Sequence, residues 1–147
     1  MNYIGVIMLH FKNFCIKYQS VLLYAIFGVL TTIVNILVFF VFYNLLHTDH
    51  NIAYIAAWFW AVFFAYLTNR VWVFHSKNTT FADITKEIWQ FYLARILTGI
   101  IGYFILNFGV DLLKQDANIW NVIQNIFVIV SNFVLSKLII FKKDNNV

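Results

Sequence analysis

Residues 52–74 read IAYIAAWFWAVFFAYLTNRVWVF, an apolar stretch whose only charged residue, Arg70, lies close to its end. At a rise of about 1.5 Å per residue, such a stretch crosses a hydrocarbon core of about 30 Å as an α-helix. Proline, which interrupts helices, is absent from the whole chain of 147 residues. The stretch therefore predicts a membrane-spanning helix.

Three further apolar runs have spanning length, at residues 22–46, 91–113 and 119–141. The chain is 63% hydrophobic and 11% charged, with a mean hydropathy of +0.80. Soluble domains average about 45–50% apolar and about 25% charged residues. The sequence therefore predicts an all-α integral membrane protein with four transmembrane helices, joined by loops 47–51, 75–90 and 114–118. No cleavable signal peptide is evident, so we expect the first run to be an uncleaved anchor.

The basic residues are unevenly distributed along this pattern. Of ten Lys and Arg residues, all but Lys114 belong to the N-terminal segment, the middle loop, the C-terminus or the adjoining span ends. Short loops rich in Lys and Arg remain in the cytoplasm. We therefore expect a multi-pass protein of the cytoplasmic membrane with both termini in the cytoplasm.

Residues 1–20 form a separate segment before the predicted transmembrane domain of residues 21–143. Apolar residues share one face at helical spacing, and His10, Asn13 and Lys17 share another. This pattern is typical of an amphipathic helix that lies in the membrane interface. A frayed tail is the alternative.

The chain resembles itself when it is shifted by 67 residues without a gap. Asp49 and Asn51 then align with Asp116 and Asn118, and LTNRVWVFHSK (67–77) aligns with VLSKLIIFKKD (134–144). We interpret this as two helical hairpins, with repeat halves at about 20–77 and 87–144, related as a parallel repeat. The alternative is a coincidence of hydropathy.

Three cations lie inside the predicted spans, each four residues from an aromatic end: Arg70, Arg95 and Lys137. Four helical residues span about 6 Å, which places all three slightly below the cytoplasmic interface. Simple anchoring by snorkelling side chains is one explanation. The other is a socket for a lipid phosphate, which Arg binds through two parallel N–H donors, with Asn69 and Trp72 assisting.

Several amides also lie inside the spans, among them Asn35, Asn107, Asn125 and Asn132. Hydrogen bonds between helices are the simpler explanation. A track for the polar head group of a sugar-carrying lipid is the alternative. Small residues favour close helix packing, either within one chain or between subunits, and they recur in an alanine ridge and a glycine set: Ala53, Ala57, Ala61 and Ala65, then Gly99, Gly102 and Gly109.

The remaining motifs point to little chemistry. His47, Asp49 and His50 are ligand-type residues confined to one short loop, whereas metal sites usually draw ligands from several elements. Catalytic motifs are absent, so we expect no enzyme, no metal and no cofactor. One cysteine, Cys15, excludes an internal disulfide. The net charge of +4 lies at span ends, so nucleic acid is not an expected partner.

With these residues in hand, the chain resembles the GtrA-like family of small four-span membrane proteins. The resemblance covers residues 22–143 and rests on Tyr24-Ala25-Ile26-Phe27-Gly28-Val29 with Thr32, on Asn69-Arg70-Val71-Trp72-Val73-Phe74, and on Arg95 with Gly102. The second hairpin departs from the pattern, with Ser136-Lys137 in place of Asn69-Arg70.

This resemblance implies translocation of a polyprenyl-phosphate-linked monosaccharide across the cytoplasmic membrane, for modification of a cell-surface glycan. A separate glycosyltransferase would load the sugar, and membrane lipids and further copies of this chain are expected partners. A non-transporting partner that anchors or organises the glycosyltransferase is the alternative. A small multidrug-type exporter is disfavoured, because residues 22–46 contain no acid.

Overall fold

The computed structural model describes residues 17–141, and all of the regular structure in this part of the chain is helical. Each span consists of an α-helix followed directly by a five-residue π-helical turn. In order, these are α2 (Gln19–Phe40) with η1 (Val41–Leu45), α3 (His50–Thr68) with η2 (Asn69–Val73), α4 (Phe81–Asn107) with η3 (Phe108–Leu112), and α5 (Ala117–Leu135) with η4 (Ser136–Ile140). The predicted interfacial helix of residues 1–20 lies almost entirely outside the described residues.

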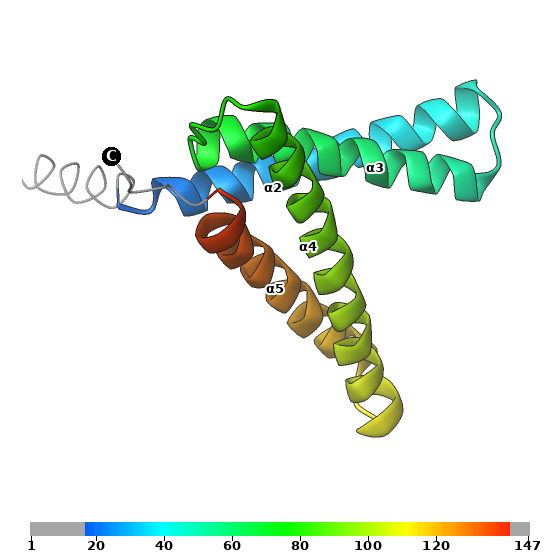
Figure 1. The fold of residues 1–147 in the computed structure, drawn as a ribbon. Helices are drawn as coiled ribbons and strands as arrows, with labels where there is room; N and C mark the ends of the chain where they lie inside the picture. The colour runs from blue at the N-terminus through cyan, green and yellow to red at the C-terminus, as the bar shows by residue number, and fades with distance from the viewer. Residues whose placement is uncertain (1–16, 142–147) are drawn as a thin grey trace, which may run out of the picture. The chain divides into compact units, whose positions relative to one another are not determined.

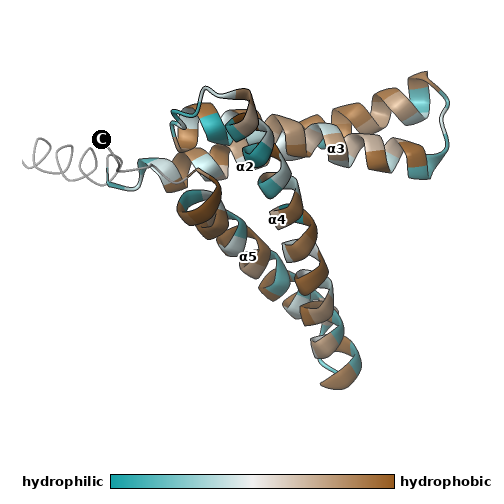
Figure 2. Ribbon diagram, in the orientation of Figure 1, coloured by the Kyte–Doolittle hydropathy of each residue, from teal (hydrophilic) through white to brown (hydrophobic). Residues whose placement is uncertain are grey.

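All four helical stretches are long and apolar enough to cross a membrane: Gln19–Leu45, His50–Val73, Phe81–Leu112 and Ala117–Ile140. Figure 2 shows hydrophobic residues along most of their length and hydrophilic residues concentrated at the turns and at the start of α4. The prediction of an all-α integral membrane protein with four transmembrane helices is therefore confirmed.

The chain divides into two compact units between His75 and Ser76, and each is described here by itself. Unit 1 is the hairpin of α2 and α3, and unit 2 is the hairpin of α4 and α5 (Figure 1). The bounds of α3 reappear in α5 after a shift of 67 residues, from His50 to Ala117 and from Thr68 to Leu135. All four π-helical turns match in the same way, so the two units share one plan of elements.

The hairpin turns of the two units also correspond in their helix caps and in their backbone conformation. Asp49 caps α3 by accepting from the N–H of Asn51 at 2.8 Å, and Asp116 caps α5 by accepting from the N–H of Asn118 at 2.8 Å. His47 and Lys114 occupy the left-handed backbone region at equivalent positions, with φ of 51° and 55°. An aspartate is among the best helix N-caps, and here it fixes where each second helix begins.

Helix α4 begins ten residues before the predicted span, so the prediction of a loop over residues 75–90 is wrong for residues 81–90. The segment reads FADITKEIWQ, which is too polar for a hydropathy criterion but contains good helix formers. Asp83 lies in the first turn, where a negative charge favours the helix dipole. The apolar run therefore marked only the membrane-embedded part of a longer helix.

Small residues lie on the surface between the two helices of each hairpin, but the two hairpins place them on different helices. In unit 1 the predicted alanine ridge of α3 is buried where this helix packs against α2. In unit 2 the small residues are Gly102 of α4 and Gly109 of η3, which continues α4. A Cβ at Gly109 would overlap the ring of Trp120, and a Cβ at Gly102 would lie 2.7 Å from Oε1 of Gln124. A Cβ at Gly99 would meet nothing within 4 Å, so Gly99 makes no close helix contact within this chain, and packing of Gly99 between subunits stays a prediction.

Candidate functional site

The asparagine–arginine–tryptophan motif of unit 1 lies in η2, the π-helical turn that ends α3. The backbone N–H of Phe74 donates to the carbonyl of Asn69 at 2.9 Å, which is the wide i to i−5 spacing of a π-helix. Such turns often occur at functional sites. Arg70 is half-buried on this turn and Trp72 is exposed.

Asn69 is buried, and its amide is only partly satisfied. Nδ2 donates to the carbonyl of Ala65 at 2.6 Å. Among the described residues, none donates to Oδ1, although this oxygen is buried. A buried acceptor without a donor is costly, which makes Asn69 Oδ1 a candidate acceptor for a ligand hydroxyl. The sequence predicts that Asn69 assists in phosphate binding, and this role stays a prediction.

Trp72 is held by stacking within unit 1. Its ring lies 5.4 Å from that of Phe27 on α2, centroid to centroid, with the two planes inclined by 19°. One face of the indole is therefore occupied by Phe27, yet half of the side chain remains exposed. The outer part of the ring is available to a lipid or a ligand.

Unit 2 holds its two cations at one level of the hairpin. Phe91 of α4 and Phe141 lie in contact, with ring centroids 6.0 Å apart. Deeper in the hairpin, the Thr98 hydroxyl bonds Oδ1 of Asn132 at 3.0 Å. Arg95 lies between these two contacts on one helix, and Lys137 lies between them on the other. Their side chains therefore start from similar depths.

Aromatic rings support both cations. The guanidinium carbon of Arg95 lies 4.8 Å from the centroid of the Phe91 ring, and Nζ of Lys137 lies 5.7 Å from that of Phe133. Cation–π contacts of this kind stabilise a charge in a medium that hydrates it poorly. Arg70 occupies, in unit 1, the position that Lys137 occupies in unit 2. The socket formed by all three cations stays a prediction.

The predicted path amides differ in how far the fold already engages them. Asn132 is buried between α4 and α5 through Thr98. Nδ2 of Asn107 donates to the Tyr103 carbonyl at 2.9 Å, within its own helix. Asn35 is half-buried on α2, and Asn125 is exposed. Asn132 therefore has a structural role, whereas Asn125 retains an exposed amide that a ligand could contact.

Asn125 belongs to an amide cluster that the sequence analysis did not recognise. Nδ2 of Asn125 and Nε2 of Gln124 both donate to Oδ1 of Asn121, at 2.9 Å and 3.0 Å. The three residues follow helical spacing on α5, which was the available signal. Exposed amides within a span favour a neighbour that can hydrogen-bond, either water, a ligand or protein.

A second feature missed from the sequence is a buried carboxylate near the start of α4. Glu87 is 2% exposed, and its Oε1 accepts from the hydroxyl of Ser76 at 2.6 Å and from Nδ2 of Asn78 at 2.9 Å. Because residues 75–90 were interpreted as a loop, Glu87 was not counted among the groups inside a span. Its spacing of four from Phe91 and eight from Arg95 would have placed all three on one helical face.

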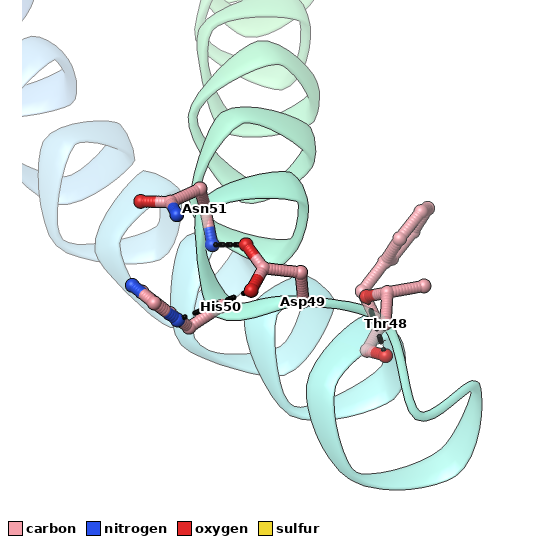
Figure 3. A network of polar contacts seen from close by, with 5 residues as sticks. Thr48, Asp49, His50 and Asn51 are labelled. Atoms are coloured by element: carbon pink, nitrogen blue, oxygen red, sulfur yellow. Dashed lines mark hydrogen bonds and ion pairs between the residues drawn. The ribbon is translucent and has the colours of Figure 1, made fainter.

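The ligand-type residues of the first hairpin turn serve the backbone (Figure 3). The N–H of Asn51 donates to Asp49 and lowers the pKa of that carboxyl from its usual 3.8. Nδ1 of His50 lies 3.5 Å from the same carboxylate. Thr48 donates its hydroxyl to the carbonyl of Phe42 at 2.8 Å. Among the described residues, no group of three or more His, Cys, Asp or Glu side chains gathers as a metal site would require.

Comparison with known families gives a match over nearly all of the described chain. The model of the GtrA/DPMS transmembrane domain matches residues 23–141. The chain belongs to this family. The GtrA/DPMS match begins inside α2 and ends at Phe141, so every predicted site residue lies within it.

Several curated relatives share this GtrA/DPMS region. The uncharacterized membrane protein YwcD of Bacillus subtilis is 34% identical over 121 residues, which cover 82% of this chain and 95% of the relative. The cell wall teichoic acid glycosylation protein GtcA of Listeria innocua is 36% identical over 127 residues, covering 84% of this chain and 86% of the relative. GtcA of Listeria monocytogenes serovar 1/2a has the same identity and coverage. No solved structure matches the chain significantly.

Proposed function

We propose that this chain takes part in the modification of a cell-surface glycan by translocating a polyprenyl-phosphate-linked monosaccharide across the bacterial cytoplasmic membrane. The role in glycan modification is supported by the GtrA/DPMS family and by relatives that are named for teichoic acid glycosylation. This proposal has three parts beyond that role: the translocation step, the assignment to the cytoplasmic membrane, and the orientation with both termini in the cytoplasm.

The observation that carries the proposal is the pair of cations at one level of unit 2. Arg95 and Lys137 extend from facing helices, each against an aromatic ring, between the Phe91–Phe141 and Thr98–Asn132 contacts. A charged side chain inside a span is costly and marks a functional site by default. A phosphate ester satisfies two such cations at once, because it offers several acceptor oxygens and a negative charge.

The other residues have distinct roles in this mechanism. In unit 1, the corresponding roles that we propose are phosphate binding by Arg70 and contact with the head group by the exposed part of Trp72. Asn69 Oδ1 accepts a hydrogen bond from a sugar hydroxyl, for which it has no other donor among the described residues. Asn125 and its amide neighbours then contact the sugar along α5, while the lipid tail stays in the bilayer. A homo-oligomer supplies the volume that four spans alone enclose poorly.

Reconstituted protein tests the proposal directly. Proteoliposomes containing only this chain and a polyprenyl-phosphate-linked sugar should expose the sugar to an external probe faster than empty liposomes do. Replacing Arg95 by Ala removes the proposed charge-assisted hydrogen bond to the lipid phosphate and should slow this rate by roughly tenfold or more. Lys114→Ala is the matched control. Lys114 lies in the turn of unit 2, at the other end of the hairpin from Arg95, so its removal should leave the rate unchanged.

The second candidate is a non-transporting partner that anchors a glycosyltransferase. The start of α4 favours it, because this helix extends beyond the apolar run and exposes Phe81 and Trp89 there. Folded protein that flips no lipid, yet loses a co-purified glycosyltransferase when both aromatics become Ser, would replace the transport proposal with this one.

A further inference from the structure

The side-chain oxygen of Asn69 is a buried acceptor whose orientation the fold defines. Asn69 is 3% exposed, and its Oδ1 has no donor among residues 17–141. Nδ2 donates to the carbonyl of Ala65 at 2.6 Å, and a carbonyl can receive a hydrogen bond only from the N–H side of an amide. The other side of the amide is therefore the oxygen, which can only accept.

The contact with Ala65 does not explain why an asparagine occupies this position. The backbone N–H of Asn69 already donates to the same carbonyl, so Nδ2 adds a second donor to an acceptor that the helix satisfies. A leucine of similar shape would fill the position without burying an oxygen that lacks a donor. The asparagine therefore points to a donor that residues 17–141 do not supply.

Unit 2 shows that the fold can satisfy a buried asparagine with a donor of its own. Oδ1 of Asn132 accepts from the hydroxyl of Thr98 at 3.0 Å, across the two helices. The position that matches Asn69 lies four residues further along and holds Ser136. Among the described residues, a buried side-chain acceptor without a donor is found at Asn69 and not in unit 2.

The chemistry of this acceptor selects among the groups of the proposed ligand. Ionised phosphate oxygens are acceptors and a polyprenyl chain is hydrocarbon, so neither can donate to Oδ1. Sugar hydroxyls can donate. Arg70 follows Asn69 directly in the chain, and the phosphate is bonded directly to the sugar in the lipid. Phosphate binding by Arg70 would therefore bring the sugar close to this turn.

The outer side of the same turn is open to a ligand. Val71 and Trp72, on η2 with Asn69, are 48% and 52% exposed. Exposed side chains can move without opening the packed interior of the hairpin. A small displacement at this turn is enough to admit a hydroxyl to the enclosed oxygen.

We propose that Asn69 distinguishes the sugar-loaded lipid from bare polyprenyl phosphate by accepting a hydrogen bond from a sugar hydroxyl. This inference rests on the proposed function and adds to it the discrimination between loaded and empty lipid. Bare lipid phosphate leaves the buried oxygen without a donor, so it binds with one hydrogen bond fewer. The empty lipid therefore competes less well for the site.

The test compares two lipids that differ in their hydrogen-bond donors. Full-length protein in nanodiscs is titrated with polyprenyl-phosphate-linked glucose and with the same lipid after O-methylation of the glucose hydroxyls, and bound lipid is counted by native mass spectrometry. The wild type should prefer the first lipid. Asn69→Leu should reduce this preference on the order of fivefold, because the buried acceptor is gone. A wild type without the preference, or a folded variant that retains it in full, overturns the proposal.

Two controls define the route of the effect. Ser136→Ala changes the matching buried position of unit 2 and should leave the preference unchanged, so an equal loss there contradicts a specific role for Asn69. Bare polyprenyl phosphate should bind Asn69→Leu as well as it binds the wild type. A parallel loss of bare-lipid binding would assign Asn69 to the phosphate and overturn the proposal.

Thermal melting without ligand separates this role from a structural one. Asn69→Leu removes a buried oxygen that lacks a donor, so the melting temperature should stay the same or rise. Asn69→Ser copies Ser136 of unit 2 and keeps the test decisive if leucine packs poorly. A clear fall in both variants would show that the asparagine serves stability, which contradicts the proposal.

Failure of this inference is distinguishable from failure of the proposed function. Wild-type protein that binds neither loaded nor bare polyprenyl phosphate refutes the proposed function, and the discrimination with it. Wild-type protein that binds both lipids, with an unchanged preference in both Asn69 variants, refutes the discrimination alone.

Discussion

The two hairpins have the same order of helical elements, but their large and small side chains lie on opposite helices. At matching positions, unit 1 places Phe42 on its first helix and Ala53 on its second, whereas unit 2 places Gly109 first and Trp120 second. Both second-helix positions lie at the hairpin turn, and both pairs combine one aromatic residue with one small residue. At these positions the combined size of the two side chains is therefore kept, whereas the individual residues differ.

The same exchange recurs deeper in the hairpins. Gly102 faces Gln124 in unit 2, and the matching residues of unit 1 are Asn35 and Ala57. Without a hydrophobic driving force in lipid, helices associate through van der Waals packing, which requires such complementary surfaces. The comparison teaches that two hairpins can share one order of helical elements while the side chains at matching positions differ in pairs.

The largest effect should come from filling the space beside Trp120. Gly109→Ala puts a methyl group where the indole already lies, so we expect a loss of about 1–3 kcal/mol in the free energy of unfolding. Adding Trp120→Ala removes the overlap and should restore part of the stability. Thermal melting in detergent measures both variants.

Gly99→Ala is the matched control for this comparison. A methyl group at position 99 meets nothing within 4 Å, and alanine is a better helix former than glycine. The melting temperature should stay the same or rise slightly. A large loss at position 99 but not at position 109 would contradict the exchange of side-chain size between the hairpins.

A smaller effect is expected at the polar contact that only unit 2 possesses. Asn132→Ala copies Ala65 of unit 1 and removes the partner of the Thr98 hydroxyl. That hydroxyl also lies 2.8 Å from the Ala94 carbonyl, so it keeps one acceptor, and the cost should be about 0.6–1 kcal/mol. Ser131→Ala, on the half-buried neighbouring position, is the control. An unchanged melting temperature for Asn132→Ala would show that the Thr98–Asn132 hydrogen bond does not stabilise the packing of α4 against α5.

The smallest effect concerns Asp49, the capping aspartate of unit 1. The folded pKa of Asp49 is lowered by the N–H of Asn51, so its contribution to stability is present above pH 3.8 and is lost as the pH falls through the folded pKa. Asp49→Asn keeps a capping acceptor but does not titrate. The difference in melting temperature between wild type and variant should therefore shrink below about pH 4. A difference independent of pH would contradict this.

Sequence reasoning located the spans because hydropathy reports membrane burial directly. It placed the second span at 52–74, and the structure has it at His50–Val73. It failed at residues 81–90, where a polar helix continues an apolar one, and this error hid Glu87. It also could not tell that Gly99 lacks a close neighbour within the chain, because a helix that is apolar all round does not reveal which face its neighbour covers.

The candidate site was predictable in composition but not in arrangement. Arg95 and Lys137 stand out as charges in apolar surroundings, whereas their common depth depends on the contact between Phe91 and Phe141. It could not be foreseen either that Oδ1 of Asn69 has no donor among residues 17–141, because this depends on Nδ2 donating to Ala65. Such details follow from helix register, which spacing alone leaves open.

The length of α4 has a consequence for hydrophobic matching with the bilayer. Phe81–Leu112 contains 32 residues and Ala117–Ile140 contains 24. At about 1.5 Å per residue these are roughly 48 Å and 36 Å, against a hydrocarbon core of about 30 Å. The first helix of unit 2 therefore overhangs the core by about 18 Å. The excess length belongs to the polar first part of α4, residues 81–90, so this end of the helix is long enough to pass through the head-group layer while the apolar run stays among the acyl chains.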